Sequence, residues 1–169
     1  MLRQKAGCLA CAGAGLLTLL GMGVSAAAGP QGAGQDLAAV KAEMIRLTNA
    51  ERAKANLKPL VLDARLSRAA QKHSNLMAEK QKLDHNLGGT RAGDRVDAEN
   101  YNWVGVDEII FRAGQPEAAN AAKAIQYWMS SRTGHREAIL TPEYTHIGVG
   151  VRYSSSGVPY LTEVFARPQ

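Results

Sequence analysis

Cysteine is nearly absent from this 169-residue sequence, which contains only Cys8 and Cys11. Both lie within the first 28 residues, so removal of that segment leaves a chain without a disulfide and without a thiol nucleophile. The sequence also lacks the Gly-x-Ser-x-Gly motif of serine hydrolases and the His-Glu-x-x-His motif of zinc peptidases. A packed core must therefore stabilise the fold, and no familiar catalytic motif predicts an enzyme.

Aromatic residues are also scarce, at 5%, and the formal net charge is only +5. No basic stripe interleaved with aromatic residues is present, so a nucleic-acid partner is not expected. The modest basicity is compatible with weak attraction to acidic lipid or cell-wall surfaces.

One long apolar run is present, over residues 6–28, after the basic residues Arg3 and Lys5. It ends in small residues of the kind that a signal peptidase recognises. The alternative interpretation is a transmembrane anchor, but no second apolar run follows. We predict a secreted or periplasmic protein with a signal peptide over 1–28, a flexible stub over 29–35 and one domain over 36–167.

Helical periodicity marks three segments of the predicted domain. Residues 36–55 carry apolar side chains at steps of three and four, and Asn56 suits a left-handed residue at the helix end. Asp63 is placed to cap a second helix, and residues 116–132 form a third amphipathic pattern.

The end of the chain has the two-residue period of β-strands. Residues 146–153 and 160–165 alternate around the turn 154–157, which predicts an antiparallel hairpin, and residues 104–111 predict a short strand. Helices followed by a hairpin indicate an α+β domain, with helices covering a small sheet.

A long segment over residues 82–103 is rich in Gly, Asp and Asn. We predict a loop with one helical turn near residues 94–98. Irregular segments of this length in a compact domain usually serve a function.

Several short strings occur in a characteristic order. They are Leu47–Arg52, Leu57–Leu60, Ala69–His73, Asp84–His85, Tyr101–Trp103, Trp128–Met129, Gly134–Arg136 and Ile147–Gly150. Over residues 40–166 this order resembles the CAP (SCP) superfamily of cysteine-rich secretory proteins, venom antigens, plant pathogenesis-related proteins and bacterial secreted proteins. The resemblance implies a three-layer α-β-α sandwich.

The resemblance also implies a cavity in which two histidines and two acidic residues converge, sometimes around a divalent cation. His85 matches the first histidine and Glu108 matches the glutamate of the family's Gly-Glu-Asn motif. An imidazole beside a carboxylate suits zinc or a comparable divalent cation. The same pair could instead hold a proton and orient a water molecule.

This sequence departs from the family pattern at the other cavity positions. Asp107 and Ile109 replace the glycine and asparagine of the motif, the second histidine falls at Glu143, and the second acid falls near Ser131. Metal binding by His85 and Glu108 is therefore an open alternative. The side chains that could complete the cavity are Ser131, His135, Glu143 and His146.

Other polar residues have a structural interpretation. His73 lies on the apolar side of its helix, and we interpret it as a core histidine with a hydrogen-bond partner. We expect Asn49 and Arg52 to fasten the first helix to the loop after it. Asp97 and Glu99 are expected on a solvated loop face.

Three functions are compatible with these features. The first is a binding module for a lipid or another extracellular or envelope ligand, with the loop over residues 82–103 beside the cavity. The second is a hydrolase in which His85 activates a water molecule and Glu108 orients it, with or without a divalent cation. The third is an envelope protein with a vestigial cavity. The missing catalytic motifs favour binding.

Overall fold

Residues 35–169 are described by a computed structural model, in which helices come first and a long hairpin comes last. In chain order the elements are α1 (Leu37–Lys54), β1 (Val61–Leu62), α2 (Ala64–Lys80), the 3-10 helix η1 (Leu87–Gly89), α3 (Ala92–Asp97), β2 (Trp103–Arg112), α4 (Ala121–Ser130), α5 (His135–Leu140), β3 (His146–Tyr153) and β4 (Pro159–Pro168). The predicted signal peptide and nearly all of the predicted stub lie outside the described residues. Within residues 35–169, no helix has both the length and the apolar character needed to cross a membrane.

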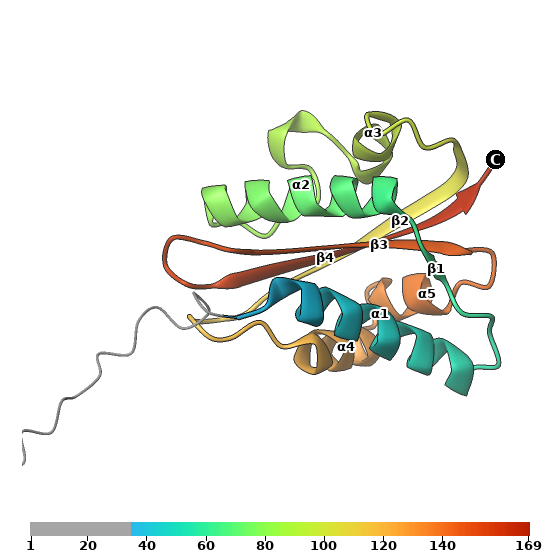
Figure 1. Cartoon of the computed structure of the whole chain (residues 1–169), viewed down its shortest axis with the longest axis horizontal. Coiled ribbons are helices and arrows are strands. Elements are labelled where there is room, and N and C mark those ends of the chain that lie inside the picture. The colour runs from blue at the N-terminus through green and yellow to red at the C-terminus, as the bar shows by residue number, and fades with distance from the viewer. Residues whose placement is uncertain (1–34) are drawn as a thin grey trace, which may run out of the picture.

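The sheet lies between two layers of helices (Figure 1). Its strand order is β1-β3-β4-β2, with β2 and β3 antiparallel to β4 and β1 parallel to β3. Helices α2 and α3 cover one face, and α1, α4 and α5 cover the other. The predicted α+β fold, a three-layer α-β-α sandwich with a C-terminal antiparallel hairpin, is therefore confirmed. Strand β2 is an end strand of the sheet.

Local capping places the first two long helices where the sequence predicts them. The side chain of Asp36 accepts backbone N–H groups from the first turn of α1, and Asp63 does the same for α2. A carboxylate at this position satisfies donors that have no partner inside the helix. Asn56 adopts the predicted left-handed conformation, with a φ of 58°.

Helix α4 is shorter than the helix predicted over residues 116–132. The side chain of Gln35 donates to the C=O of Ala119 and accepts from its N–H, each at 2.8 Å. Asn120 then caps the helix by accepting the N–H of Lys123. Because Gln35 holds the Ala119 backbone from a distant part of the chain, the helix begins only after Asn120.

Helix α2 packs directly on the backbone of β3. Gly148 and Gly150 face the helix, and a Cβ atom at either position would lie well under 3.0 Å from backbone atoms of Leu66 or Ala70. Real Cβ atoms do not approach other atoms that closely. The two glycines therefore allow α2, which carries His73, to lie against the sheet.

Asn49 and Arg52 fasten α1 to the loop after it, as predicted. Asn49 exchanges two hydrogen bonds with the backbone of Leu60, at 2.8 and 3.1 Å. Arg52 donates to the C=O of Lys58, and the same buried guanidinium also reaches carbonyl groups at Ile139, Thr141 and Tyr144. This arginine therefore ties α1 to the end of α5 as well.

One acid is fully buried on the α1 side of the sheet. Glu163 in β4 has no exposed surface, and the hydroxyl of Thr48 lies 3.0 Å from both of its carboxyl oxygens. Burial raises the pKa of Glu163 to about 8, although the Thr48 hydrogen bond acts in the opposite direction. The carboxyl group is therefore protonated in the folded protein at neutral pH.

Glu163 should make the folded protein less stable as pH rises. Its carboxyl pKa is about 8 in the folded chain against an ordinary value of 4.5, so between these values only the unfolded chain loses the proton. The free energy of unfolding should then fall by roughly 1.4 kcal/mol per pH unit from this group alone. Urea denaturation across this pH range measures the slope. Glu163→Gln should reduce it, whereas Glu143→Gln, at an exposed position, should not. Equal slopes in both variants would show that Glu163 is ionised when buried.

Candidate functional site

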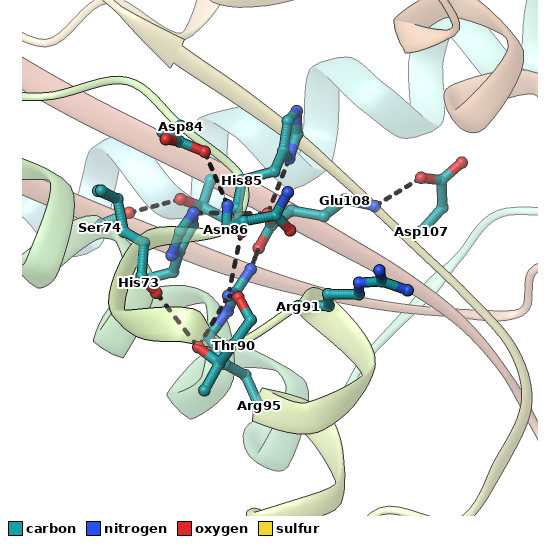
Figure 2. A network of polar contacts seen from close by, with 12 residues as sticks. His73, Ser74, Asp84, His85, Asn86, Thr90, Arg91, Arg95, Asp107 and Glu108 are labelled. Atoms are coloured by element: carbon teal, nitrogen blue, oxygen red, sulfur yellow. Dashed lines mark hydrogen bonds and ion pairs between the residues drawn. The ribbon is translucent and has the colours of Figure 1, made fainter.

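Glu108 in β2 is the centre of a buried polar cluster, which Figure 2 shows from close by. Its carboxyl oxygen Oε1 lies 2.9 Å from Nδ1 of His85 and 3.5 Å from Nε2 of His73. Its other oxygen, Oε2, accepts a hydrogen bond of 2.7 Å from the guanidinium of Arg95. The His85 side chain is 47% exposed, whereas only 2% of the Glu108 side chain is exposed. His85 is therefore the member of this cluster that solvent or a ligand can reach.

Three elements and a loop bring these side chains together. Glu108 comes from β2, His73 from α2 and Arg95 from α3, while His85 lies in the loop after α2. Arg95 also donates to the backbone C=O of His85 at 3.2 Å and of Thr90 at 2.7 Å. The guanidinium therefore holds both the loop and the carboxylate in place.

The charges in this cluster set its protonation. Burial raises the pKa of Glu108, but the hydrogen bond from His85 and the contacts with His73 and Arg95 together outweigh it, so this pKa lies below its ordinary value. Burial lowers the pKa of His73, and the nearby carboxylate only partly offsets that effect. At neutral pH the cluster therefore holds an ionised Glu108, balanced by Arg95, beside a neutral His73.

His73 is buried as predicted, and a contact with the backbone of Asp84 raises its pKa as a hydrogen bond would. Among residues 35–169 neither ring nitrogen forms a hydrogen bond of good geometry, and Nε2 lies 3.5 Å from Oε1 of Glu108. The packing of α2 on the sheet directs the ring at the face where Glu108 lies. In the sequence, the only indication of the contact between His73 and Glu108 was the position of His73 on the apolar face of its helix. Arg95 was missed altogether, because nothing in the sequence distinguishes it from the nearby Arg91.

His135 approaches from the opposite helical layer, at the start of α5. Its Nδ1 atom shares a hydrogen bond of 2.8 Å with the hydroxyl of Ser131, which also accepts the backbone N–H of Thr133. Burial lowers the pKa of His135, and the charge of His85 acts in the same direction. The ring is therefore neutral at neutral pH and is oriented by Ser131.

A cavity of about 550 Å³ opens beside β2, between α3 and the segment that leads into α5. It is lined by His85, Arg91, Ala92, Gly93, Asp94, Asp97, Trp103, Val106, Asp107, Glu108, Ile109, Thr133, Gly134 and His135. Among the predicted site residues, His85, Glu108 and His135 thus share one cavity. Ser131 does not line it and contacts it through His135.

Two predicted site residues lie elsewhere. Glu143 is exposed in the turn between α5 and β3 and does not line the cavity. His146 begins β3, where its ring shares a hydrogen bond of 2.9 Å with Thr145 and packs edge-on to Tyr101. The structure therefore does not bring these two side chains to His85 and Glu108. A ligand-binding role for the predicted residues stays a prediction.

The donor atoms beside Glu108 do not fit the zinc or other divalent cation that the family resemblance implied. Residues 35–169 contain no group of three or more His, Cys, Asp or Glu side chains placed to hold a metal ion. Arg95 already contacts one oxygen of Glu108, and His85 uses Nδ1 for the other. A structural zinc site needs about four ligands, and a guanidinium would repel the ion.

The loop over residues 82–103 contributes much of the cavity wall, including Arg91, Asp94 and Trp103. The predicted helical turn in this loop is α3. Asp97 accepts the indole N–H of Trp103 at 2.8 Å. The expectation of a solvated Glu99 was wrong, because Glu99 is 7% exposed and bonds to side chains of α2 at 2.6 Å.

Comparison with known proteins gives a consistent family match. The family model described as "CAP: Cysteine-rich secretory protein family" matches residues 45–165. The uncharacterized protein YkwD of Bacillus subtilis (strain 168) is 38% identical over 122 residues, which are 72% of this chain and 45% of YkwD. The chain thus spans less than half the length of that relative.

Solved structures agree with the fold. An extracellular SCP-domain protein from Bacillus anthracis is 25% identical with a TM-score of 0.66, covering 77% of this chain and 41% of that one. An outer surface protein of Borrelia burgdorferi is 18% identical with a TM-score of 0.72, covering 80% of this chain and 97% of that one. At this level of identity, the Borrelia structure shows likeness of fold alone.

Proposed function

The chain belongs to the CAP, or cysteine-rich secretory protein, family, and from that premise we propose that it is an extracellular binding protein whose ligand enters the cavity beside β2. Two observations support the location. The Bacillus anthracis and Borrelia proteins are described as extracellular and as an outer surface protein. Residues 1–28 also have the predicted features of a signal peptide.

The lining of the cavity is the observation that supports binding. Its volume, about 550 Å³, is typical of sites for small ligands. Trp103 and Val106 supply an apolar wall, while Arg91, Asp94 and His85 supply charged or polar groups around it. A sterol or acyl chain would gain no hydrogen bonds from these polar groups and would displace water from those that it covers. This lining therefore favours a polar ligand over a lipid.

A hydrolase is the second candidate, because the His85–Glu108 contact has the geometry of a base oriented by a carboxylate. Nδ1 of His85 is held by the carboxylate, so Nε2 is the ring atom left for a water molecule. Thr133 is the hydroxyl side chain that lines the cavity, where its Oγ1 lies 3.4 Å from Nδ1 of His135 and shares a hydrogen bond of 2.9 Å with Ser131. The shorter contact is the one between His85 and Glu108, which favours a water molecule at His85 over the Thr133 hydroxyl as the attacking group.

A fragment screen by NMR tests the proposed binding. Blocked dipeptides, small sugars and phosphatidylglycerol vesicles are added separately to the ¹⁵N-labelled chain. We expect polar fragments to shift the amide signals of Val106 and His135 and the indole signal of Trp103. His85→Ala should weaken such binding about fivefold, the value of one hydrogen bond. His146→Ala is the matched control, because His146 does not line the cavity.

The outcomes of this screen separate the three functions. Fragment signals that cluster at the cavity support binding, and a response to vesicles alone would favour a lipid. Hydrolysis products that appear over time and disappear with Glu108→Gln would favour the enzyme. If no fragment shifts the cavity signals at millimolar concentration, the cavity is vestigial and the proposal fails.

A further inference from the structure

The cavity follows the unpaired edge of the sheet. Its lining includes four consecutive residues of β2, Val106 to Ile109. Neighbouring residues of a strand point their side chains to opposite faces of the sheet. Four consecutive residues can therefore line the same cavity only along the backbone edge of the strand. Because β2 is the last strand in the order β1-β3-β4-β2, this edge has no neighbouring strand in the sheet.

Two side-chain contacts show which backbone groups of β2 point away from β4. The N–H of Glu108 donates to the carboxylate of Asp107 at 2.8 Å (Figure 2). The C=O of Ile110 accepts the indole N–H of Trp128 at 3.0 Å. In an antiparallel ladder, every second residue of a strand directs both its N–H and its C=O to the same edge of that strand. Val106, two positions before Glu108, therefore directs its N–H and C=O outward as well.

The partner strand agrees with this assignment. Val106 is paired with Ala166 of β4, and the C=O of Ala166 accepts the N–H of Thr145 on the β3 side. Ala166 thus turns its backbone away from β2. The N–H and C=O of Val106 and the C=O of Glu108 therefore point away from β4, on the edge along which the cavity-lining residues Val106 to Ile109 lie. Backbone groups that point outward from an end strand are the template for adding another strand.

The carboxylate of Asp107 takes the place that a carbonyl of an added strand would occupy. It accepts the outward N–H of Glu108, and the Asp107 side chain is itself exposed. An exposed carboxylate can return to water at small cost when a peptide carbonyl replaces it. Asp107 also stands where the family motif has glycine, so this arrangement belongs to this chain's own sequence.

The charges of the lining indicate the chemistry of the added strand. Asp94, Asp97 and Asp107 carry negative charge, against Arg91 as the single lining arginine. The fourth lining acid, Glu108, is already balanced by Arg95. Positive side chains on the ligand are therefore favoured by complementarity.

We infer that the ligand is an extended peptide with basic side chains, which pairs with the outward backbone groups of Val106 and Glu108 and extends the sheet. This inference rests on the proposed binding function and names its ligand class. The four edge residues span about 13 Å, enough for a peptide of about four residues. Its side chains alternate between the wall that holds His85 and Trp103 and the wall that holds His135.

Backbone methylation of the peptide tests this inference. The probe is a blocked tetrapeptide of alternating lysine and valine, titrated into the ¹⁵N-labelled chain. Two analogues carry N-methyl groups on alternate residues, so that only one of them blocks the N–H groups that face β2. We expect one analogue to bind about tenfold more weakly and the other to bind like the parent peptide. An analogue with glutamate in place of lysine should also bind more weakly.

The variant Asp107→Ala supplies the second test. It removes the carboxylate that competes for the N–H of Glu108, so an uncharged tetrapeptide with serine in place of lysine, which does not use the charge of Asp107, should bind more tightly. If Asp107 only protects the edge, the variant should instead self-associate and show no gain in peptide affinity, which would overturn the inference. Sedimentation measured together with the titration distinguishes these results.

The remaining outcomes are also decisive. Equal binding of both methylated analogues and the parent would exclude backbone pairing. Failure of every tetrapeptide, while sugar fragments still bind at the cavity, would overturn the peptide inference and leave the proposed function standing. If neither class binds, both fail.

Discussion

Gly148→Ala should destabilise the fold by about 3 kcal/mol or more, because the added Cβ has no room. It would overlap the backbone at Leu66 and Ser67 in α2. A crowded side chain can rotate away, but a helix backbone must move as a whole. Urea denaturation measures the loss as a lower midpoint. The same displacement would move His73 away from Glu108.

Gly114→Ala is the matched control for this prediction. Nothing lies within 4 Å of the Cβ that this substitution would add. The same chemical change should therefore alter stability by less than about 1 kcal/mol. Equal losses in the two variants would mean that α2 does not pack closely on β3.

Arg52→Met should cost at least about 3 kcal/mol of unfolding free energy, because several buried acceptors lose their donor at once. The guanidinium contacts four carbonyl groups at distances of 2.7 to 3.1 Å. Methionine fills most of the volume but donates no hydrogen bond. The loss should appear in both thermal and urea unfolding.

Arg46→Met tests whether the effect belongs to the buried position. Arg46 lies on the same helix, and its guanidinium pairs with Glu43 on the protein surface. Exposed pairs of this kind contribute little to stability. We therefore expect a small change for Arg46→Met, and a comparable loss in the two variants would argue against the clamp that Arg52 forms between α1 and α5.

The elements that the sequence predicted well are those set by local interactions. The carboxylate caps at Asp36 and Asp63 lie within a few residues of the groups they bind. The β3–β4 hairpin likewise depends on alternation and a short turn. The start of α4 was misplaced because it depends on the distant Gln35. The short parallel pairing of β1 with β3 joins residues that are about as far apart in the sequence as Gln35 and Ala119. No local sequence pattern predicted this pairing.

The burial of Glu163 was not predicted, for a related reason. Both faces of β4 are covered by helices, so its residues from Pro159 to Ala166 are all buried. Alternation in such a strand separates two buried faces and says nothing about exposure. An acid in that pattern therefore carries no sign that it is buried and neutral.

The candidate site was only partly visible in the sequence. His85 and Glu108 were found by family resemblance, not by any local pattern. Arg95, which pairs with Glu108, lies in the short helix α3, within a segment where charged residues are common. The replacement of the motif's glycine by Asp107 was noticed, but its hydrogen bond to the backbone of Glu108 follows only from the geometry of β2.

Hydrogen exchange at the Val106 amide tests most directly whether ligand binds along the β2 edge. Its rate is compared in the free chain and in the chain saturated with the lysine–valine tetrapeptide. A strand-edge site predicts that exchange at Val106 slows by about tenfold or more, while the exposed Glu143 amide keeps its rate. If the peptide is bound and Val106 exchanges as fast as in the free chain, the peptide does not pair with β2.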